Sequence, residues 1–146
     1  FGFIPNNIEL YKLALIHKSA SLVLEDGRPI NNERLEFLGD AVLGFICAEY
    51  IYEHFRSMPE ASSPSCGPPS SVKILYQWAK LIDLGGFLFL GKGEEMTGGR
   101  DRPSILSDAF EAVIAAIYLD GGIEPARTFV MRFAAPPSGW GHAQGE

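Results

Sequence analysis

Four carboxylates stand out because they are the only charged residues in two otherwise nearly apolar stretches. Residues 35–48 contain Glu36 and Asp40, residues 103–119 contain Asp108 and Glu111, and neither stretch has a Lys or Arg. A carboxylate that is buried without a cation costs several kcal/mol, so it must be protonated, reach water or lie against a bound metal. A metal site accounts for all four acids together.

Both pairs of acids are spaced to lie on one side of a helix. At about 100° per residue, Glu36 and Asp40 lie about 40° apart around a helix axis, and Asp108 and Glu111 lie about 60° apart. Two such helices that face each other would form a cage of carboxylate oxygens. Oxygen ligands without His or Cys favour Mg²⁺ or Mn²⁺ over zinc or copper, and a cage of this kind binds phosphate oxygens.

Other interpretations of the same acids stay open. A single Asp or Glu on a helix is most often an ordinary carboxylate that faces solvent, although four together weaken that interpretation. A di-iron site of the helical-bundle type would need a His three residues after a helical Glu, but Gly39 and Ile114 occupy those positions. The spacing argues against an oxidase, whereas a bundle hydrolase that acts on a small phosphorylated substrate stays an alternative.

The elements that must position the acids are helices, because apolar residues recur at helical intervals along most of the chain. Asn6 or Asn7 is suited to cap the first helix, and Asn31 or Asn32 the second. We expect an all-α helical bundle, with helices at residues 8–17, 33–55, 72–84, 103–119 and 124–133.

Small side chains near the acids would let two of these helices approach closely. A glycine inside a helix costs about 1 kcal/mol relative to alanine, so Gly39 beside Asp40 indicates a packing or access requirement. Tight packing is an equally good explanation for Gly44. The alanines at positions 112, 115 and 116 offer similar room on the second acidic helix.

The composition bounds the size and class of the protein. With 146 residues, of which 47% are hydrophobic and 21% charged, the chain is the size of one globular domain. The net charge of −6 argues against a diffuse basic surface, so binding an anion would need metal ions or a local basic groove.

No apolar run reaches the about 20 residues of a membrane span. Cys47 and Cys66 are interpreted as free thiols, as in a protein of the reducing cytoplasm. We therefore expect a cytoplasmic protein without membrane contact.

Two segments depart from the helical pattern. Residues 60–71 read EASSPSCGPPSS, and their three prolines exclude a regular helix. Residues 135–146 have a similarly irregular composition. We expect one domain over residues 1–134, with an irregular insert at 60–71, followed by an unstructured tail at 135–146.

The loop before the second acidic helix carries two further signals. Residues 86–93 come close to a nucleotide-binding loop, but Gly93 replaces the required Ser or Thr, so we expect a turn and no nucleotide cofactor. Arg100 and Arg102 could contact RNA phosphates, or they could be solvated loop charges without a specific role.

The two acidic motifs resemble those of a known family. Residues 32–43, which read NERLEFLGDAVL, look like the signature helix of ribonuclease III, the endonucleases specific for double-stranded RNA. Residues 91–112, which read GKGEEMTGGRDRPSILSDAFEA, are similar to the second acidic motif of that family. His17, Lys18 and Ser19 resemble a weaker feature near its start. Relatives normally have a helical segment in place of residues 60–71 and continue into a double-stranded-RNA-binding domain, of which we see no sign after Phe133.

The resemblance implies roles for particular residues and a fold of the ribonuclease III endonuclease type. Glu36, Asp40, Asp108 and Glu111 would form the metal site, with Asp40 and Glu111 in the positions credited with catalysis. Glu33 matches a further acidic position of the family. The implied reaction is Mg²⁺-dependent hydrolysis of double-stranded RNA in RNA processing, with Mn²⁺ as a substitute, which leaves 5′ phosphate and 3′ hydroxyl ends.

The resemblance also implies a homodimer. Subunits of the family pair across the signature helix, which places one acidic cluster against each RNA strand and gives staggered ends. Phe37 matches an aromatic residue that packs into a socket on the partner, although an internal core position is the alternative for its ring. A non-catalytic RNA-binding or dimerisation module on the same scaffold is the alternative function.

Overall fold

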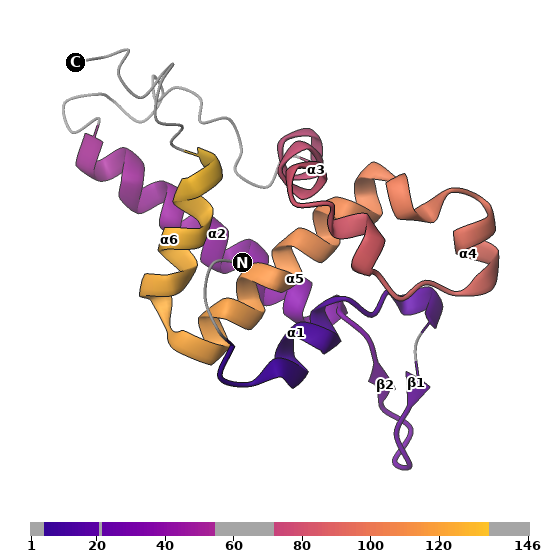
Figure 1. The fold of residues 1–146 in the computed structure, drawn as a ribbon. Helices are drawn as coiled ribbons and strands as arrows, with labels where there is room; N and C mark the ends of the chain where they lie inside the picture. The colour runs from indigo at the N-terminus through magenta and orange to yellow at the C-terminus, as the bar shows by residue number, and fades with distance from the viewer. Residues whose placement is uncertain (1–4, 21, 55–71, 135–146) are drawn as a thin grey trace.

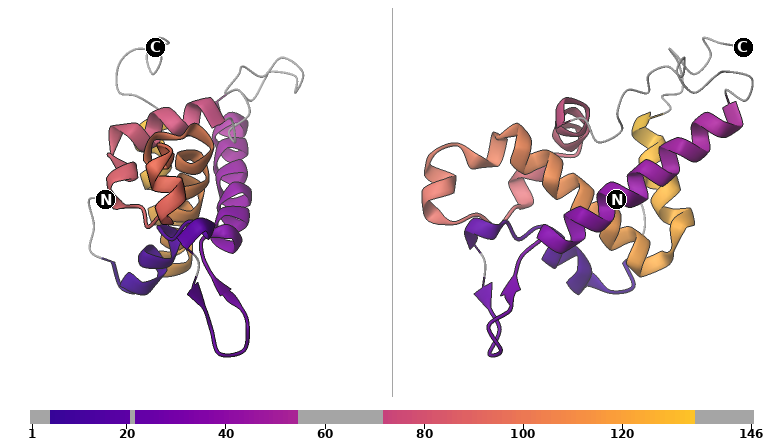
Figure 2. Two further views of the ribbon diagram at one scale, coloured as in Figure 1. Left: turned by 90° about the vertical axis from the view of Figure 1, so that its right-hand side faces the viewer. Right: turned by 180° about the vertical axis from the view of Figure 1, so that it is seen from behind.

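Helix α5 (Pro103–Gly121) forms the centre of the fold, and the other long helices pack around it. The computed structural model describes residues 5–20, 22–54 and 72–134. Around α5 lie α1 (Ile8–Ala14), α2 (Glu33–His54), α3 (Val72–Leu81) and α6 (Ile123–Ala134) (Figure 1). The left view of Figure 2 shows α2 along one side of α5 and α3 above it. The predicted all-α bundle is confirmed.

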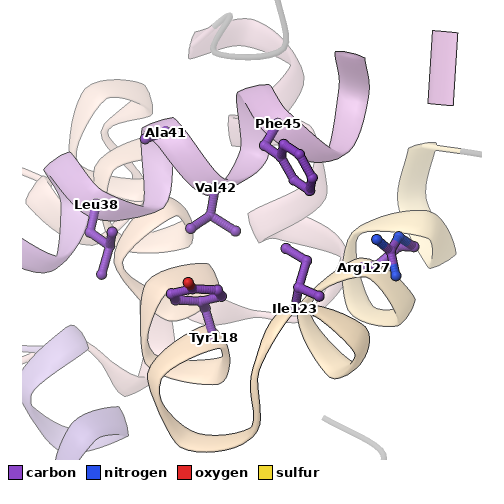
Figure 3. Close-up of a pocket in the computed structure, with 7 residues that line it drawn as sticks. All are labelled: Leu38, Ala41, Val42, Phe45, Tyr118, Ile123 and Arg127. Atoms are coloured by element: carbon purple, nitrogen blue, oxygen red, sulfur yellow. The ribbon is translucent and has the colours of Figure 1, made fainter. Parts of the chain in front are cut away.

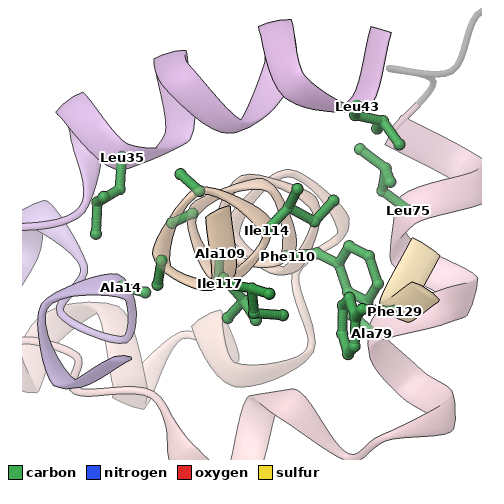
Figure 4. Close-up of a cluster of buried hydrophobic side chains, with 14 of the residues drawn as sticks. Ala14, Leu35, Leu43, Leu75, Ala79, Ala109, Phe110, Ile114, Ile117 and Phe129 are labelled. Carbon is green, nitrogen blue, oxygen red and sulfur yellow. The ribbon is translucent and has the colours of Figure 1, made fainter. Parts of the chain in front are cut away.

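Helix α5 is central because it has no polar face. Residues 105–107 and 109–117 are all buried, and a helix that is apolar on every side is stable only when other elements enclose it. Figure 4 shows its side chains facing Leu35 and Leu43 of α2 and Leu75 of α3. Pro103 begins the helix, and Gly122 ends it with a φ of 93°, a value that side chains disfavour. The two polar buried residues of α5, Ser107 and Glu111, therefore stand out.

Four aromatic rings hold α3 and α6 against α5. The ring of Phe110 lies 5.8 Å from Trp78, 5.5 Å from Phe129 and 5.4 Å from Phe133, measured between centroids. Trp78 belongs to α3, and the two other phenylalanines belong to α6. Aromatic pairs at such distances contribute about 0.5–1.5 kcal/mol each beyond the burial of their area. The cluster thus stabilises the helix that carries Asp108 and Glu111.

Helix α2 is apolar on two faces. One face packs against α5 through buried side chains: Leu35, Val42, Leu43 and Ile46. The other face carries Phe37, Phe45 and Tyr52, whose side chains are 83%, 54% and 75% exposed. The core of the subunit does not need this second face, so the expectation of an internal core position for Phe37 is excluded.

Short elements connect the helices. The 3₁₀ helix η1 (Lys18–Ala20) follows α1, and β1 (Leu22–Val23) pairs antiparallel with β2 (Pro29–Ile30). Figure 1 shows this hairpin projecting away from the helices just before α2. Between α3 and α5 the chain forms η3 (Leu84–Phe87), α4 (Lys92–Met96) and η4 (Gly99–Asp101). The sequence pattern predicted neither the hairpin nor α4.

The caps were predicted correctly, whereas two helices are shorter than predicted. The Asn7 Oδ1 accepts a hydrogen bond of 3.1 Å from the Glu9 amide, and the Asn31 Oδ1 accepts one of 2.9 Å from the Glu33 amide. The helix predicted at 8–17 ends at Ala14. The helix predicted at 72–84 ends at Leu81, because Asp83 adopts a left-handed φ of 54° that a helix cannot continue through.

Some predictions lie outside the described residues. These include the insert at 60–71, the tail at 135–146, Phe55 and Cys66, so the domain boundaries stay predictions. Within the part of the chain that the structure describes, none of the helices combines the length and apolar character needed to cross a membrane.

Candidate metal centre and active site

Three carboxylates from two helices converge on one point. Glu36 of α2 and Asp108 and Glu111 of α5 each contribute an oxygen, and these oxygens lie within 4.8 Å of one another. Opposite ligands of an octahedral Mg²⁺ ion lie about 4.2 Å apart, so a small adjustment of the side chains would place all three around one ion. The donor set, carboxylate oxygens alone, is the kind that Mg²⁺ and Mn²⁺ prefer.

Gly39 makes this convergence possible. A Cβ atom at Gly39 would overlap the backbone carbonyl group of Glu111 on α5. The two backbones are therefore in direct contact at the position between Glu36 and Asp40, which brings the acids of α2 onto Glu111. The packing requirement expected of Gly39 is confirmed. The one suggested for Gly44 is wrong, because a Cβ atom there would meet nothing within 4 Å.

Burial differs sharply among the four predicted acids. Glu111 is 6% exposed, Glu36 and Asp108 are partly buried, and Asp40 is exposed. Asp40 is not one of the three convergent carboxylates, but its side chain forms a hydrogen bond with Glu111. Asp40 therefore lies at the exposed edge of the cluster, beside Glu111, and its part in the metal site stays a prediction.

The crowded acids retain protons that isolated acids would lose. Burial, followed by the hydrogen bond and the charge of Asp40, raises the pKa of Glu111 from 4.5 to about 9. Burial and the hydrogen-bonded Asp108 carboxyl also raise the pKa of Glu36. The pKa of Asp108 is raised by burial, against the lowering effects of Glu36 and of the nearby His17 and Lys18. A divalent cation could take the place of these protons, since it stabilises the ionised carboxylates.

Two residues that we did not assign to the site lie beside it. The charges of His17 and Lys18 act on Asp108, and Lys18 also acts on Glu36. The Lys18 Nζ lies 3.9 Å from the Glu33 Oε2, on the first turn of α2. The signal in the sequence was the resemblance of residues 17–19 to a family feature, which by itself gave them no position in space.

Arg100 and Arg102 instead hold their own loop together. The Arg100 Nη1 donates hydrogen bonds to the Gly85 carbonyl at 3.0 Å and the Leu88 carbonyl at 2.7 Å. The Arg102 Nη2 donates to the Thr97 carbonyl at 2.9 Å, and its Nη1 pairs with Glu94. Both guanidinium groups are therefore engaged within the chain, so they are not simply solvated loop charges.

A hollow lies on the exposed face of α2. It has a volume of about 420 Å³ and opens between α2, the end of α5 and the start of α6 (Figure 3). The residues that line it are Leu38, Ala41, Val42, Phe45, Tyr118, Ile123 and Arg127. None of the four acids lines this hollow, so it is distinct from the candidate metal centre.

Comparison with known proteins agrees with the acidic motifs. A model of the ribonuclease-III-like family matches residues 7–137. The chain belongs to this ribonuclease-III-like family. The match includes both acidic helices, α2 and α5, and the His17 to Ser19 segment. Membership of the family thus rests on a match over most of the sequence and not on the two motifs alone.

Individual ribonuclease III relatives give the same result. Ribonuclease 3 of Syntrophomonas wolfei subsp. wolfei is 47% identical over 125 residues, which cover 85% of this chain and 53% of the relative. Ribonuclease 3 of Moorella thermoacetica is 44% identical over 136 residues, which cover 89% and 55%. The chain spans about half the length of these curated relatives.

The fold also matches a solved ribonuclease III structure. A nuclease domain of ribonuclease III from Campylobacter jejuni superposes with a TM-score of 0.78 at 37% sequence identity. The match covers 90% of this chain and 89% of that domain. The described fold is therefore that of a ribonuclease III nuclease domain.

Proposed function

We propose that the protein is a Mg²⁺-dependent endonuclease that cleaves double-stranded RNA as a homodimer and leaves 5′ phosphate and 3′ hydroxyl ends. The observation that carries the proposal is the convergence of Glu36, Asp108 and Glu111 in a chain of the ribonuclease-III-like family. Mn²⁺ is proposed as a substitute ion. A role in RNA processing and a cytoplasmic location belong to the same proposal, and family membership supports them.

The side chains of the cluster have separable roles in this proposal. Glu36, Asp108 and Glu111 would hold the divalent ions, since their oxygens already lie together. The ions, when bound, would supply the Lewis acidity that activates water and stabilises the leaving oxygen. Asp40, which is exposed beside Glu111, would add a fourth carboxylate to the metal site at its open edge, and Asp40 and Glu111 are the two acids that we propose for catalysis.

The test is cleavage of a long duplex RNA by the purified 146-residue chain in Mg²⁺. We expect cleavage to stop when EDTA is added and in the Glu111→Gln variant, which keeps the shape of the side chain but removes an ionised ligand. Glu9→Gln is the matched control, because Glu9 is an exposed acid on α1 that pairs with Lys12. Cleavage that persists in EDTA or in Glu111→Gln would refute the mechanism.

The same experiment separates the alternative function. A folded chain that binds duplex RNA but does not cut it in Mg²⁺ or Mn²⁺ would favour the non-catalytic module. Turnover of small phosphorylated compounds without cleavage of duplex RNA would favour the bundle hydrolase instead. The presence of all four acids supports the nuclease over both.

The exposed face of α2 supports the proposed homodimer. Phe37 is 83% exposed, and the apolar hollow of Figure 3 lies along the same helix. An exposed aromatic ring and an apolar hollow on one face are complementary when two copies pair about a two-fold axis, because each copy offers both. The Campylobacter jejuni nuclease domain is itself described as having a region involved in dimer formation. We propose that Phe37 of each subunit fills the hollow of the other.

A further inference from the structure

The segment that carries Lys18 is fixed in place on both sides. The Ser19 amide donates a hydrogen bond of 3.1 Å to the His17 Nδ1, and the Ser19 Oγ, 2.8 Å from the same nitrogen, accepts one of 2.8 Å from the Gly91 amide. The His17 amide donates to the Phe89 carbonyl at 3.0 Å. A Cβ atom at Gly91 would overlap the Ser19 carbonyl, so the loop before α4 packs directly on η1. These contacts hold the backbone on both sides of Lys18 against the loop before α4.

This position puts the Lys18 ammonium group beside the acidic cluster. Its Nζ lies 3.9 Å from the Glu33 Oε2, and its charge acts on both Glu36 and Asp108. The two side chains of the Lys18–Glu33 pair are 66% and 57% exposed. An exposed ion pair at this separation contributes little to stability, so Lys18 can exchange Glu33 for another partner at little cost.

The two arginines of the loop before α5 and the neighbouring His17 are already engaged. Arg100 donates to two backbone carbonyls, and Arg102 donates to the Thr97 carbonyl and pairs with Glu94. The His17 Nδ1 accepts the Ser19 amide, and burial and the Lys18 charge lower the pKa of His17, so its ring favours the neutral form. Of the two cations whose charges act on Asp108, Lys18 is therefore the one held only by a long, exposed ion pair.

From this arrangement we propose that Lys18 binds a phosphate of the RNA backbone next to the scissile bond, releasing Glu33 as it does so. The proposal rests on the proposed nuclease function, and it adds a protein cation to a site otherwise built from acids. A chain with a net charge of −6 repels RNA at long range, so a fixed cation beside the metal centre would help to place the strand.

The direct test is the salt dependence of RNA binding. We would measure binding of a labelled duplex by fluorescence anisotropy in the Glu111→Gln background, with Mg²⁺ present and with Lys18 intact or replaced by Gln or Arg. Loss of one phosphate contact should weaken binding about tenfold and reduce the slope of log K against log salt by about 0.9. The Lys18→Arg variant should retain the wild-type slope.

Lys12 provides the matched control. It is an exposed lysine on α1, 60% exposed, in an ion pair of 3.4 Å with Glu9, so Lys12→Gln removes the same charge away from the cluster. We expect Lys12→Gln to leave the slope unchanged. Equal slopes for Lys18→Gln and the unmodified background, or equal losses for Lys18→Gln and Lys12→Gln, would overturn the proposal.

The cleavage assay separates this proposal from the function on which it rests. In the chain with Glu111 intact, Lys18→Gln should raise KM for duplex RNA more than it lowers kcat. If the intact chain binds RNA without cutting it, the nuclease function fails while the salt slope still decides the role of Lys18. If no duplex RNA binds at all, both proposals are rejected.

Discussion

Glu111 concentrates the chemistry of the site in one side chain. It is 6% exposed, it lies against Glu36, Asp108 and Asp40, and its backbone carbonyl touches Gly39. An acid in such a place is held protonated when no cation is bound, so the folded state without metal takes up a proton that the unfolded chain does not. The buried acids that would bind the metal therefore make the folded protein less stable when no metal is bound.

This burial predicts how the stability of the metal-free protein depends on pH. The pKa of Glu111 is 4.5 without the fold and about 9 within it. Between these values the folded state binds more protons than the unfolded state, so the free energy of unfolding must fall as pH rises. Urea unfolding in EDTA at several pH values between about 5 and 9 would measure the fall.

Glu111→Gln is the comparison for that experiment. The neutral amide has no proton to lose, so the variant should be more stable than the unmodified chain near pH 8 and should lose less stability as pH rises. Glu9→Gln should retain the full pH dependence, because Glu9 is exposed on α1. Parallel pH profiles for the unmodified chain and Glu111→Gln would show that the buried carboxyl is not protonated as described.

At the scale of elements, the two glycines of α2 make opposite predictions. Gly39→Ala should destabilise the fold by about 3 kcal/mol or more, because its new methyl group would overlap the Glu111 backbone and force α2 away from α5. Gly44→Ala should stabilise it by about 0.5–1 kcal/mol, because the same methyl group meets nothing there and alanine favours the helix. Thermal or urea unfolding of both variants would decide; equal effects would contradict the close helix contact.

The sequence was sufficient to locate the helices that carry the acids. The helix predicted at 33–55 is observed at Glu33–His54, and the one predicted at 103–119 is observed at Pro103–Gly121. Both are long, and both start at clear signals, asparagine before Glu33 and Pro103 itself. It could also be predicted that the acids of α2 face those of α5, because Gly39 marks the point where the two helices come into contact.

The short elements could not be predicted, because tertiary contacts define them. Strands β1 and β2 have two residues each, and α4 has five, too few for a periodic pattern. The position of Lys18 depends on hydrogen bonds from His17 to Phe89 and from Gly91 to Ser19, which join segments more than 70 residues apart. For the same reason, spacing alone could not show that Asp40 is exposed whereas Glu111 beside it is buried.

At the scale of the whole molecule, the exposed face of α2 predicts self-association. Phe37→Ala should raise the dissociation constant of the dimer about tenfold or more, since a central aromatic anchor often dominates an interface. Leu81→Ala is the control, because Leu81 is also apolar and 74% exposed but lies on α3. Sedimentation velocity over a range of micromolar concentrations would measure both. A strictly monomeric unmodified chain, or equal effects of the two substitutions, would contradict the proposed dimer.

The proposed activity depends on a divalent ion bound between α2 and α5. Crystals of the protein soaked in Mn²⁺ would show its position directly in an anomalous difference map. We predict a peak about 2 Å from carboxylate oxygens of Glu36, Asp108 and Glu111, and its loss in the Glu111→Gln variant. No peak at these carboxylates in a well-ordered crystal, or Mn²⁺ bound only elsewhere, would contradict the central claim.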